Sequence, residues 1–438
     1  MAISNLYPAE GPTLNLNFAN SRILDRRITF TRTTGGTYTD RDGLIKYALS
    51  DGPRFNHRYI NGEVESLGLL IEEGRTNFLP YTQNFSSGWS HIGFASQAVD
   101  TTYPNPTGNL ETKKLVEEVG NTSNQKVLYR YHDVSDAGGN NQIFSHSCFV
   151  KPIGNRHAQL NVHNAGGPAR GISVNFNLDD LSTPFSTSIS SFASNVSYGA
   201  IPYPNGWYRL YVIGNTSSQD SDGTRIAFHI RILDSDGNSD YNGDGSSGLY
   251  VYGAQMELGS FQTSYIPTNE SEGIRGADNA YMTGDNFSDW YNQSEGTFYA
   301  NSTTNVSPNL FSGSIQPAIL YATDGTSNNR IGMFYGPVNS IYTRIVSNGV
   351  QYGPSESIIG SINTTKSIIS YKTGTNGGGA SINGSVVKLS TPNLLPAVNK
   401  LVIGIQATSN FGVLNGTISQ LTYYPTRLTN AQLQNLTK

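Results

Sequence analysis

The feature that most limits what this chain can fold into is a series of short runs whose residues alternate between two faces. Residues 248–268, GLYVYGAQMELGSFQTSYIPT, are a clear example. One face of the first half carries Tyr250, Tyr252, Ala254, Met256 and Leu258, and the other carries Leu249, Val251, Gly253 and Gln255. Alternation with aromatic and β-branched residues predicts a strand, and Pro267 ends the regular pattern. We interpret this stretch as the closing strand of a central sandwich and the exit to a following domain.

Composition supports an all-β chain. The length of 438 residues suggests about two or three domains. Gly is abundant, at 47 residues, and charged residues make up only 14% of the chain, against roughly 25% in an average domain. Low charge, many turn-forming residues and many aromatic residues together favour short strands over disorder.

The spacing of strand and turn signals divides the chain into four expected segments. Residues 1–79 form an irregular N-terminal arm that buries little of its own surface, so we expect it to lie against another domain or another protein. Residues 80–268 are interpreted as a jelly-roll sandwich. Residues 269–292 are expected to be a polar connector, and residues 293–438 a second sandwich.

Individual strands are predicted from the alternating runs. In the jelly roll the strand runs are VLYRYHDV, IFSHSCFVK, HAQLNVHN, GISVNFNL, WYRLYVIG and RIAFHIRIL, and KKLVEEV is interpreted as a strand or a single helical turn. In the second sandwich, the pairs Asp324-Gly325, Asn348-Gly349 and Asn383-Gly384 predict hairpins. The final LTNAQLQNLT predicts a short helix that Thr429 caps, with Leu428 and Leu433 facing inward.

Charge, hydropathy and cysteine content exclude several classes of protein. The net charge of −4 and the lack of a Lys/Arg cluster argue against a nucleic-acid partner. No apolar run approaches the roughly 18 residues that span a membrane, and the N-terminus lacks the pattern of a signal peptide. Cys148 alone cannot form an internal disulfide, and its phase with Phe144 and Val150 predicts a buried, inert thiol. We therefore expect synthesis in a cytoplasm without secretion.

Several linked motifs resemble a module of bacteriophage tail and virion-appendage proteins. They are ESLGLLIEEGRTNFLPYTQNFSSGW (Glu65–Trp89), PNGWYRLYV (Pro204–Val212), GDGSSGLYVYGAQMELGSFQTSYIPT (Gly243–Thr268) and RGADN (Arg275–Asn279). With the upstream ITFTRTTGGTYTDRDGLIK, the resemblance covers roughly residues 20–280. It implies a jelly roll like those of carbohydrate-binding modules.

The C-terminal LNGTISQLTYYPTRLTNAQLQNL resembles the laminin-G or concanavalin-type sandwiches that phages place at the ends of fibres. Together the resemblances imply a virion protein whose partners are other virion proteins, copies of itself in a homotrimer, and host cell-surface polysaccharide. Unlike many relatives, this chain begins almost at the module. We therefore expect an anchoring role for the first 80 residues or for the sandwiches.

One face of the predicted jelly-roll strands suits a sugar. Planar amides, imidazoles, guanidinium groups and aromatic rings can hydrogen-bond hydroxyls and stack on pyranose faces. The candidate glycan-binding residues are His157, Gln159, Asn161, His163, Trp207, Arg209, Tyr211, Arg225, His229 and Arg231. The alternative interpretation is an ordinary solvated face or a subunit interface, since the sequence does not show that these strands adjoin.

Metal binding has weaker support. His157 and His163 are separated by about 20 Å along a strand, too far for a single metal ion. Asp240, Asn242 and Asp244 match the first half of an EF-type calcium loop, but Val251 stands where that loop has its bidentate Glu. Structural calcium is the only cofactor that the sequence suggests, and a plain Asx-rich turn is the alternative.

Catalytic motifs are not evident. The chain has no G-x-S-x-G elbow and no phosphate-binding loop followed by Lys-Ser/Thr. Glu72–Glu73 and Glu117–Glu118 are adjacent pairs, which in a strand point to opposite faces. We therefore expect a non-enzymatic glycan-attachment protein. The alternatives are a purely architectural decoration protein and a polysaccharide depolymerase.

Overall fold

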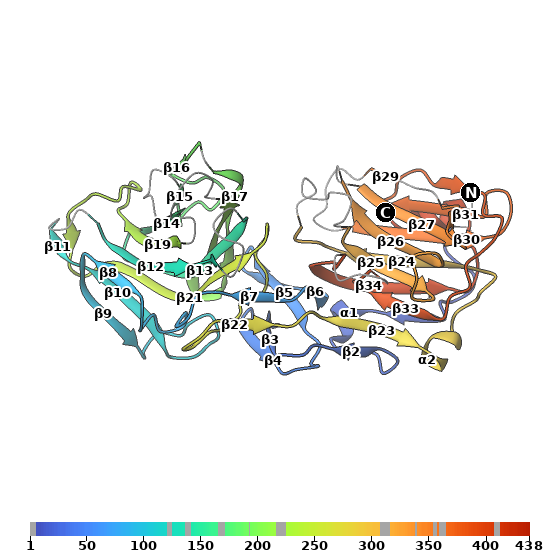
Figure 1. Cartoon of the computed structure of the whole chain (residues 1–438), viewed down its shortest axis with the longest axis horizontal. Helices are drawn as coiled ribbons and strands as arrows, with labels where there is room; N and C mark the ends of the chain where they lie inside the picture. Colours follow the sequence, from blue (N-terminus) through green and yellow to red (C-terminus); the bar gives the residue numbers. More distant parts are fainter. Residues whose placement is uncertain are drawn as a thin grey trace.

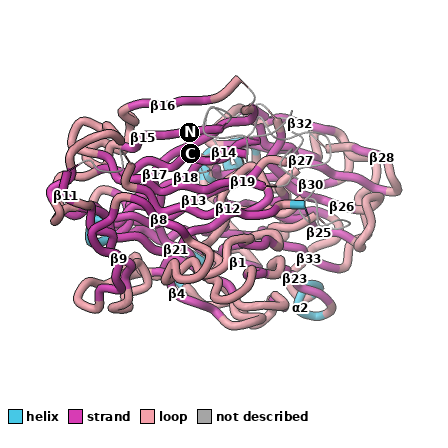
Figure 2. Tube along the Cα trace, turned by 60° about the vertical axis from the view of Figure 1, so that its left-hand side comes forward, coloured by secondary structure: helices cyan, strands magenta, loops and turns pink. Residues whose placement is uncertain are grey.

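The computed structural model describes residues 6–120, 125–135, 142–164, 171–191, 193–215, 225–306, 316–337, 340–353, 357–358, 365–406 and 412–438. Within them the chain forms two β-sandwiches that lie side by side, with strands of the first 79 residues between and against them (Figure 1). Strands dominate both sandwiches, and helix is limited to short segments (Figure 2). The predicted all-β class with tandem sandwiches is confirmed.

Two antiparallel sheets form the jelly-roll sandwich. The first, which we call the β14 sheet, has the order β16 (Ser186–Ile189), β15 (Gly171–Phe176), β14 (His157–Asn164), β19 (Arg225–Leu233), β12 (Val127–Asp133) and β8 (Ser90–Ile92). The second, the β13 sheet, has the order β17 (Ser194–Tyr203), β18 (Trp207–Asn215), β13 (Phe144–Ile153), β21 (Gly248–Leu258), β10 (Thr112–Glu117) and β9 (Phe94–Asp100). The run KKLVEEV thus belongs mainly to strand β10.

The C-terminal sandwich also has two antiparallel sheets. One has the order β32 (Lys388–Ser390), β31 (Gly378–Ile382), β30 (Thr365–Lys372), β24 (Glu295–Ser302), β34 (Gly416–Tyr424), β6 (Glu63–Ile71) and β5 (Phe55–Ile60), and β1 (Leu14–Leu16) also pairs with β34. The other has the order β2 (Thr29–Thr31), β23 (Asn279–Thr283), β33 (Lys400–Ile403), β25 (Ala318–Thr323), β26 (Arg330–Gly336), β27 (Ser340–Ser347) and β28 (Val350–Gln351), and β29 (Ser357–Ile358) pairs with β27.

Short ladders and helices complete the described elements. The ladders join β3 (Gly36–Thr39) to β4 (Ile45–Ala48), β7 (Arg75–Asn77) to β22 (Gly273–Arg275), and β11 (Val119–Gly120) to β20 (Gly243–Asp244). The α-helices are α1 (Phe18–Ser21), α2 (Asp285–Ser288) and α3 (Asn430–Leu436), and a 3-10 turn covers Pro204–Gly206. No helix in the described ranges is long and apolar enough to cross a membrane.

Alternation places one face of each jelly-roll strand in the core between the sheets. Leu160 and Val162 of β14 and Phe228 of β19 share a buried cluster with Cys148 and Val212 of the β13 sheet, each at most 1% exposed. Burial raises the pKa of the Cys148 thiol. A buried thiol with a raised pKa is inert, as predicted from its phase in the strand.

Local signals at turns and caps are also confirmed. Asn348-Gly349 has positive φ at both residues, as a two-residue hairpin turn requires, and Asn383-Gly384 has the same φ signs within a longer hairpin loop. They connect β27 to β28 and β31 to β32. Thr429 caps α3 in a reciprocal capping box with Gln432.

The alternation of β21 changes phase at Gly253. Val251 before it and Ala254 after it both face the core, although they are three positions apart. Gly253 has φ +62°, and the register with β13 shifts between Ser147 and Phe149. This is a β-bulge, which adds one residue to a strand and reverses its faces beyond that point. The uninterrupted alternation expected for this strand is therefore wrong after Gly253.

The N-terminal 79 residues do not form a separate arm in the described part of the chain. Strands β1 and β6 both pair with β34 near the C-terminus, and β2 pairs with β23. The side-chain amides of Gln432 and Asn435 also donate to the backbone carbonyls of Tyr7 and Leu6. These early strands complete the C-terminal sandwich. The sequence could not indicate this because their partners lie hundreds of residues away.

The expected connector is likewise part of the sandwich. Strand β23 lies between β2 and β33 in the sheet order. Phe287 of α2 and Trp290 are buried in the same core as Met282 of β23. Residues 269–292 are rich in polar residues, but the few apolar ones supply core contacts, so the prediction of a simple linker is wrong.

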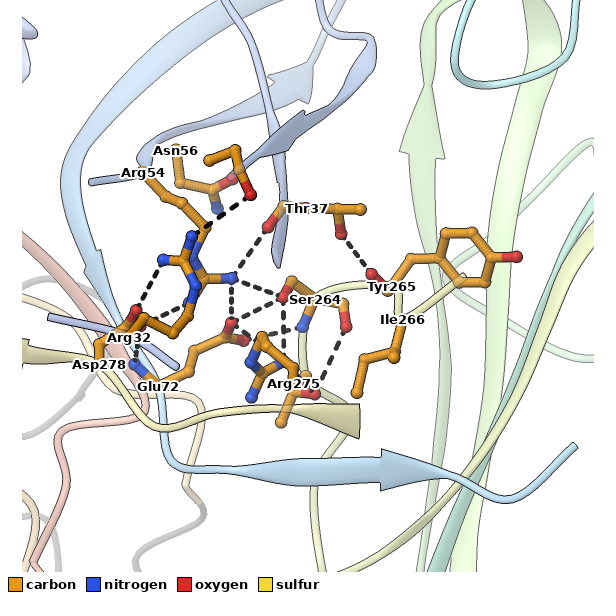
Figure 3. A network of polar contacts seen from close by, with 12 residues as sticks. Arg32, Thr37, Arg54, Asn56, Glu72, Ser264, Tyr265, Ile266, Arg275 and Asp278 are labelled. Carbon is orange, nitrogen blue, oxygen red and sulfur yellow. Dashed lines mark hydrogen bonds and ion pairs between the residues drawn. The ribbon is translucent and has the colours of Figure 1, made fainter. Parts of the chain in front are cut away.

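A buried ionic network lies where the two sandwiches meet (Figure 3). Arg54 Nη1 donates to Glu72 Oε2 at 2.7 Å, and Arg54 Nη2 donates to Asp278 Oδ2 at 2.5 Å. Arg32 Nη1 donates to the other oxygen of Asp278 at 3.0 Å, and Arg275 Nη1 lies 3.3 Å from Glu72 Oε2. These five side chains are at most 2% exposed.

The network also holds the segment that leaves the jelly roll. The backbone N–H and the hydroxyl of Ser264 donate to Glu72 at 2.8 and 2.7 Å. The hydroxyl of Thr37 donates to the carbonyl of Tyr265 next to it. Charged groups buried at this depth require such partners. The network therefore fixes the junction between the sandwiches.

Candidate functional site

Strands β14 and β19 adjoin, and their candidate residues share the face that points away from the core. Asn161 lies opposite His229, and Gln159 lies opposite Arg231. In an antiparallel pair, directly opposed residues point to the same side of the sheet. The same cross-strand rows continue to Tyr129 of β12. We call this surface the outer face of the β14 sheet.

Polar atoms without partners gather on this outer face. Within the described residues no hydrogen-bond partner is present for Gln159 Oε1, Asn161 Oδ1, His163 Nε2, His229 Nε2 or Arg231 Nε, and all five atoms are buried. Buried polar atoms are nearly always hydrogen-bonded in proteins. Five such atoms lie together on two neighbouring strands, which makes this face the candidate binding surface.

The free atoms form a mixed set of donors and acceptors. Gln159 Nε2 donates to Asn175 Oδ1 at 2.6 Å, and Asn161 Nδ2 donates to the Ser173 hydroxyl. The amide oxygens therefore remain as acceptors. In contrast, the unpartnered Nε of Arg231 is a donor.

The two histidines offer opposite hydrogen-bonding roles. His163 Nδ1 lies 2.7 Å from the carbonyl of Asn164, so Nδ1 carries the proton and Nε2 is left as an acceptor. His229 Nδ1 accepts from Arg231 Nη2 at 3.5 Å, so its Nε2 carries the proton. Burial lowers the pKa of His163, and burial followed by the nearby His163 and Arg231 lowers the pKa of His229 to about 3. Both rings are therefore neutral near pH 7.

Aromatic rings border these polar groups. The Tyr129 ring lies 5.1 Å from the His229 ring, and Tyr131 meets both His163 and His229 edge-on at 6.3 Å. Tyr131 is 41% exposed, and the guanidinium of Arg225 lies 5.3 Å from its ring. Tyr131 and Arg225 thus mark the exposed side of an otherwise buried polar cluster.

The sequence interpretation omitted four members of this face. Ser173 and Asn175 alternate with buried positions in GISVNFNL, whereas Tyr129 and Tyr131 follow no such strict alternation in VLYRYHDV. The alternation therefore contained a signal for the first two only. Only the pairing of β12 and β15 with the central strands could show that they belong to the same surface.

His157 lies apart from the unpartnered atoms. It opposes Leu233 at the beginning of β14, and its Nδ1 accepts from the backbone N–H of Leu178 at 3.0 Å. The Phe185 ring meets its imidazole edge-on at 4.8 Å. His157 therefore holds the loop after β15.

Trp207, Arg209 and Tyr211 belong to the other sheet. Strand β18 pairs with β13 and β17, so these residues lie on the outer face of the β13 sheet, and the expectation of one continuous surface is wrong. Trp207 is 1% exposed and its Nε1 donates to the carbonyl of Pro104 at 3.1 Å. Alternation identifies which side of a strand a residue occupies but not which sheet contains the strand.

The candidate calcium residues form a turn. Asp244 Oδ1 accepts from the backbone N–H groups of Ser246 and Ser247, each at 2.7 Å, and Asp244 Oδ2 accepts from the Ser247 hydroxyl and from Arg156. The Asp244 carboxylate is thus occupied by protein donors. Asp240 and Asn242 are exposed, and no group of three or more His, Cys, Asp or Glu side chains in the described ranges is arranged to hold a metal ion.

The carboxylates considered for catalysis have structural partners. Glu72 belongs to the junction network. Glu117 is fully buried and accepts from Arg156 Nε and Nη2, at 2.9 and 2.7 Å, and from the Tyr241 hydroxyl at 2.6 Å. Carboxylates held in this way stabilise loops.

Comparisons with known proteins give only distant similarities. No protein-family profile and no curated protein matches the chain. The carbohydrate-binding module CBM40 of a Ruminococcus gnavus sialidase, bound to α2,3-sialyllactose, is 12% identical, covering 34% of this chain and 84% of its own with a TM-score of 0.27. Domain 4 of the GH43 arabinanase AbnA from Geobacillus stearothermophilus, in complex with arabinotriose, is 15% identical, covering 37% and 73% with a TM-score of 0.28.

The pair of domains LG4-5 of the mouse laminin α1 chain is 8% identical, covering 81% of this chain and 93% of its own with a TM-score of 0.24. At these TM-scores the similarities support no inference about function. The fold assignment above therefore stands on the strand pairing of this chain.

Proposed function

We propose that this protein is a non-catalytic glycan-binding protein that holds sugar on the outer face of the β14 sheet. The observation that carries the proposal is the group of unpartnered polar atoms of Gln159, Asn161, His163, His229 and Arg231 on two adjoining strands. Leaving a buried polar atom without a partner costs about 1–3 kcal/mol. A ligand that supplies the missing hydrogen bonds accounts for the retention of several such atoms together.

Sugar matches the chemistry of this face. A hydroxyl group both donates and accepts, so neighbouring hydroxyls can serve the acceptors Asn161 Oδ1 and His163 Nε2 and the donor His229 Nε2 at once. The half-exposed Tyr131 ring, beside these atoms, offers an apolar surface for the C–H face of a pyranose. The neutral histidines favour an uncharged part of the glycan.

The sequence resemblance over residues 20–280 supports a bacteriophage origin. On that basis we propose a virion component of a tail fibre, tail spike or head appendage, made in the host cytoplasm and attached to host surface polysaccharide. Other virion proteins and a homotrimeric assembly are the proposed partners. Repeated copies would raise a weak affinity per site, because a tethered second site encounters a high effective concentration.

The experiment is a glycan array probed with the wild-type protein and with His229→Phe. Phenylalanine keeps the ring but removes the donor, so we expect the wild type to bind and the variant to lose about tenfold or more in affinity, one good hydrogen bond being worth up to about 1.5 kcal/mol. His146→Phe is the matched control. His146 is also buried and has an unpartnered Nε2, but it faces the core 5.4 Å from the Phe228 ring.

The outcomes separate the classes of function. Binding that survives in His146→Phe and disappears in His229→Phe supports the proposed site. A blank array with a correctly folded wild type supports the purely architectural role. Release of reducing ends from a bound polysaccharide would instead show a depolymerase.

A further inference from the structure

A cavity lies at the junction of the two sandwiches, away from the outer face of the β14 sheet. Its volume is about 300 Å³, at the lower end of the range of ligand pockets. Its lining includes Thr39 and His57 from the N-terminal strands, Tyr203 and Arg209 from the β13 sheet, and Asn305 from the C-terminal sandwich. All three parts of the chain therefore contribute to one partly open cavity.

Arg209 brings a buried positive charge to this cavity. It is 4% exposed, and its Nη1 donates to the carbonyl of Thr263 at 2.8 Å. Its Nε and Nη2 both donate to the Ser147 hydroxyl, at 3.3 and 3.0 Å. These are neutral acceptors. A guanidinium has five N–H groups, so two remain available.

The arginines of the adjacent ionic network differ from Arg209 in their partners. Arg32 and Arg54 each contact a carboxylate within 3.0 Å. Arg209 has no carboxylate within ion-pair distance among the residues that the structure describes, although it is equally buried. Burial of a charge is costly without an opposite charge. The Arg209 guanidinium instead lies 5.4 Å from the centre of the Phe149 ring, so its charge has only neutral neighbours among these contacts.

His57 provides a second unpartnered group in the same cavity. It is 6% exposed, and its Nδ1 lies 3.1 Å from the carbonyl of Thr39, so Nδ1 carries the proton. Its buried Nε2 has no partner in the described part of the chain and is an acceptor. Burial lowers the pKa of His57, which keeps the ring neutral. The Tyr203 hydroxyl lies nearby, 3.4 Å from Thr39 Oγ1.

We propose that this junction cavity binds a carboxylate-bearing monosaccharide of the uronic acid class. The two free N–H groups of Arg209 would hold the carboxylate, a geometry that guanidinium groups favour. His57 Nε2 would accept from a ring hydroxyl, and Tyr203 can donate or accept. A single unpaired cation fits a monoanion, and the hydroxyl-rich lining fits a sugar better than a simple carboxylic acid.

The test uses the full chain and D-glucuronate as the probe, with D-glucose and acetate as comparison ligands. Titration calorimetry should show that the wild type binds glucuronate with at least about tenfold higher affinity than either comparison ligand. Glucose lacks the carboxylate that Arg209 would hold, and acetate lacks the hydroxyls that His57 and Tyr203 would contact. Arg209→Gln should lose this preference for glucuronate over glucose. Arg344→Gln, in strand β27 and outside the cavity lining, should keep it.

A second readout covers the chance that Arg209→Gln fails to fold. In the wild type, glucuronate should shift the imidazole NMR signals of His57 and leave those of His163 and His229 unchanged. His57→Phe should lower the affinity while keeping the preference for the acid. Absence of glucuronate binding at tens of millimolar, equal binding of glucose, or shifts confined to His163 and His229 would overturn the proposal. Those results leave the outer-face site untouched, because the glycan array tests that site separately.

Discussion

Asn161 of β14 lies directly opposite His229 of β19, and each presents a buried polar atom without a partner on the same face of the sheet. A protein selected only for stability would place apolar side chains at such positions. In the proposed function, a ligand completes the hydrogen bonds of both residues. The stability of variants at this face therefore tests the same idea as their binding.

His229→Phe should change the free energy of unfolding by about 1 kcal/mol or less, because Nε2 has no partner and Nδ1 makes only a long bond, 3.5 Å, with Arg231. Asn77→Leu is the contrast. Asn77 is fully buried, its Nδ2 donates to the carbonyls of Ala254 and Ile266, and its Oδ1 accepts from the N–H of Met256. Asn77→Leu should therefore lower the free energy of unfolding by about 3 kcal/mol or more. Urea denaturation of both variants measures the difference, and equal destabilisation would contradict a ligand-directed role for His229.

The junction network should dominate the stability of the interface between the sandwiches. Arg54→Met leaves the carboxylates of Glu72 and Asp278 without their main partner, and we expect a loss of about 3–5 kcal/mol in guanidinium denaturation. Arg58→Met removes a pair with Glu65 whose side chains are 41% and 52% exposed, and should change stability by about 1 kcal/mol or less. Equal losses of stability in the two variants would show that the buried network does not stabilise the junction more than an exposed ion pair does.

Acid should weaken the same junction. Burial opposes ionisation of Glu72, but the charges of Arg275 and Arg54 outweigh it and lower its pKa from 4.5 to about 2. Between these values the unfolded chain binds a proton that the folded chain does not, so the stabilisation is present above pH 4.5 and is lost as the pH falls towards 2.

Urea denaturation at a series of pH values measures this loss. Glu72→Gln should be less stable than the wild type at pH 7, and the difference should shrink as the pH falls below 4.5. The exposed Glu65→Gln should follow the wild-type profile. A constant difference between Glu72→Gln and the wild type across this pH range would be inconsistent with the assignment.

Local sequence patterns predict the strands of the jelly-roll sandwich better than the strand membership of the C-terminal sandwich. The alternation in HAQLNVHN and RIAFHIRIL predicts β14 and β19 with the observed bounds, since local patterns report which side of a strand is buried. Strands β1, β5 and β6 were missed as members of the C-terminal sandwich. Strands β1 and β6 pair with β34, and β5 joins the sheet through β6; no local pattern records a partner as distant in the chain as β34.

The candidate site shows the same limit. Alternation predicts that Gln159, Asn161 and His163 share one side of their strand, as they do. It also groups Trp207 with them, although β18 lies in the other sheet. The ring of Trp207 packs with Phe149 and Tyr252 in a separate cluster against the N-terminal strands. Sheet membership is a long-range property, so composition and phase could not separate the two surfaces.

Trp207→Ala should therefore act on folding. Removing a side chain that is 1% exposed should cost about 3–5 kcal/mol, which thermal denaturation followed by tryptophan fluorescence and circular dichroism can measure. Any glycan binding should fall only in proportion to the unfolded fraction. A well-folded Trp207→Ala protein that loses binding would place the site on the β13 sheet.

The most direct measurement of the central claim is the imidazole NMR spectrum of the chain during titration with the glycan that the array identifies. The chain has 7 histidines, of which His163 and His229 lie on the outer face of the β14 sheet, while His57 lines the junction and His146 faces the core. We predict that the signals of His163 and His229 shift with saturation and that the others stay in place. Saturable binding that leaves both of these signals unmoved would contradict the proposed site.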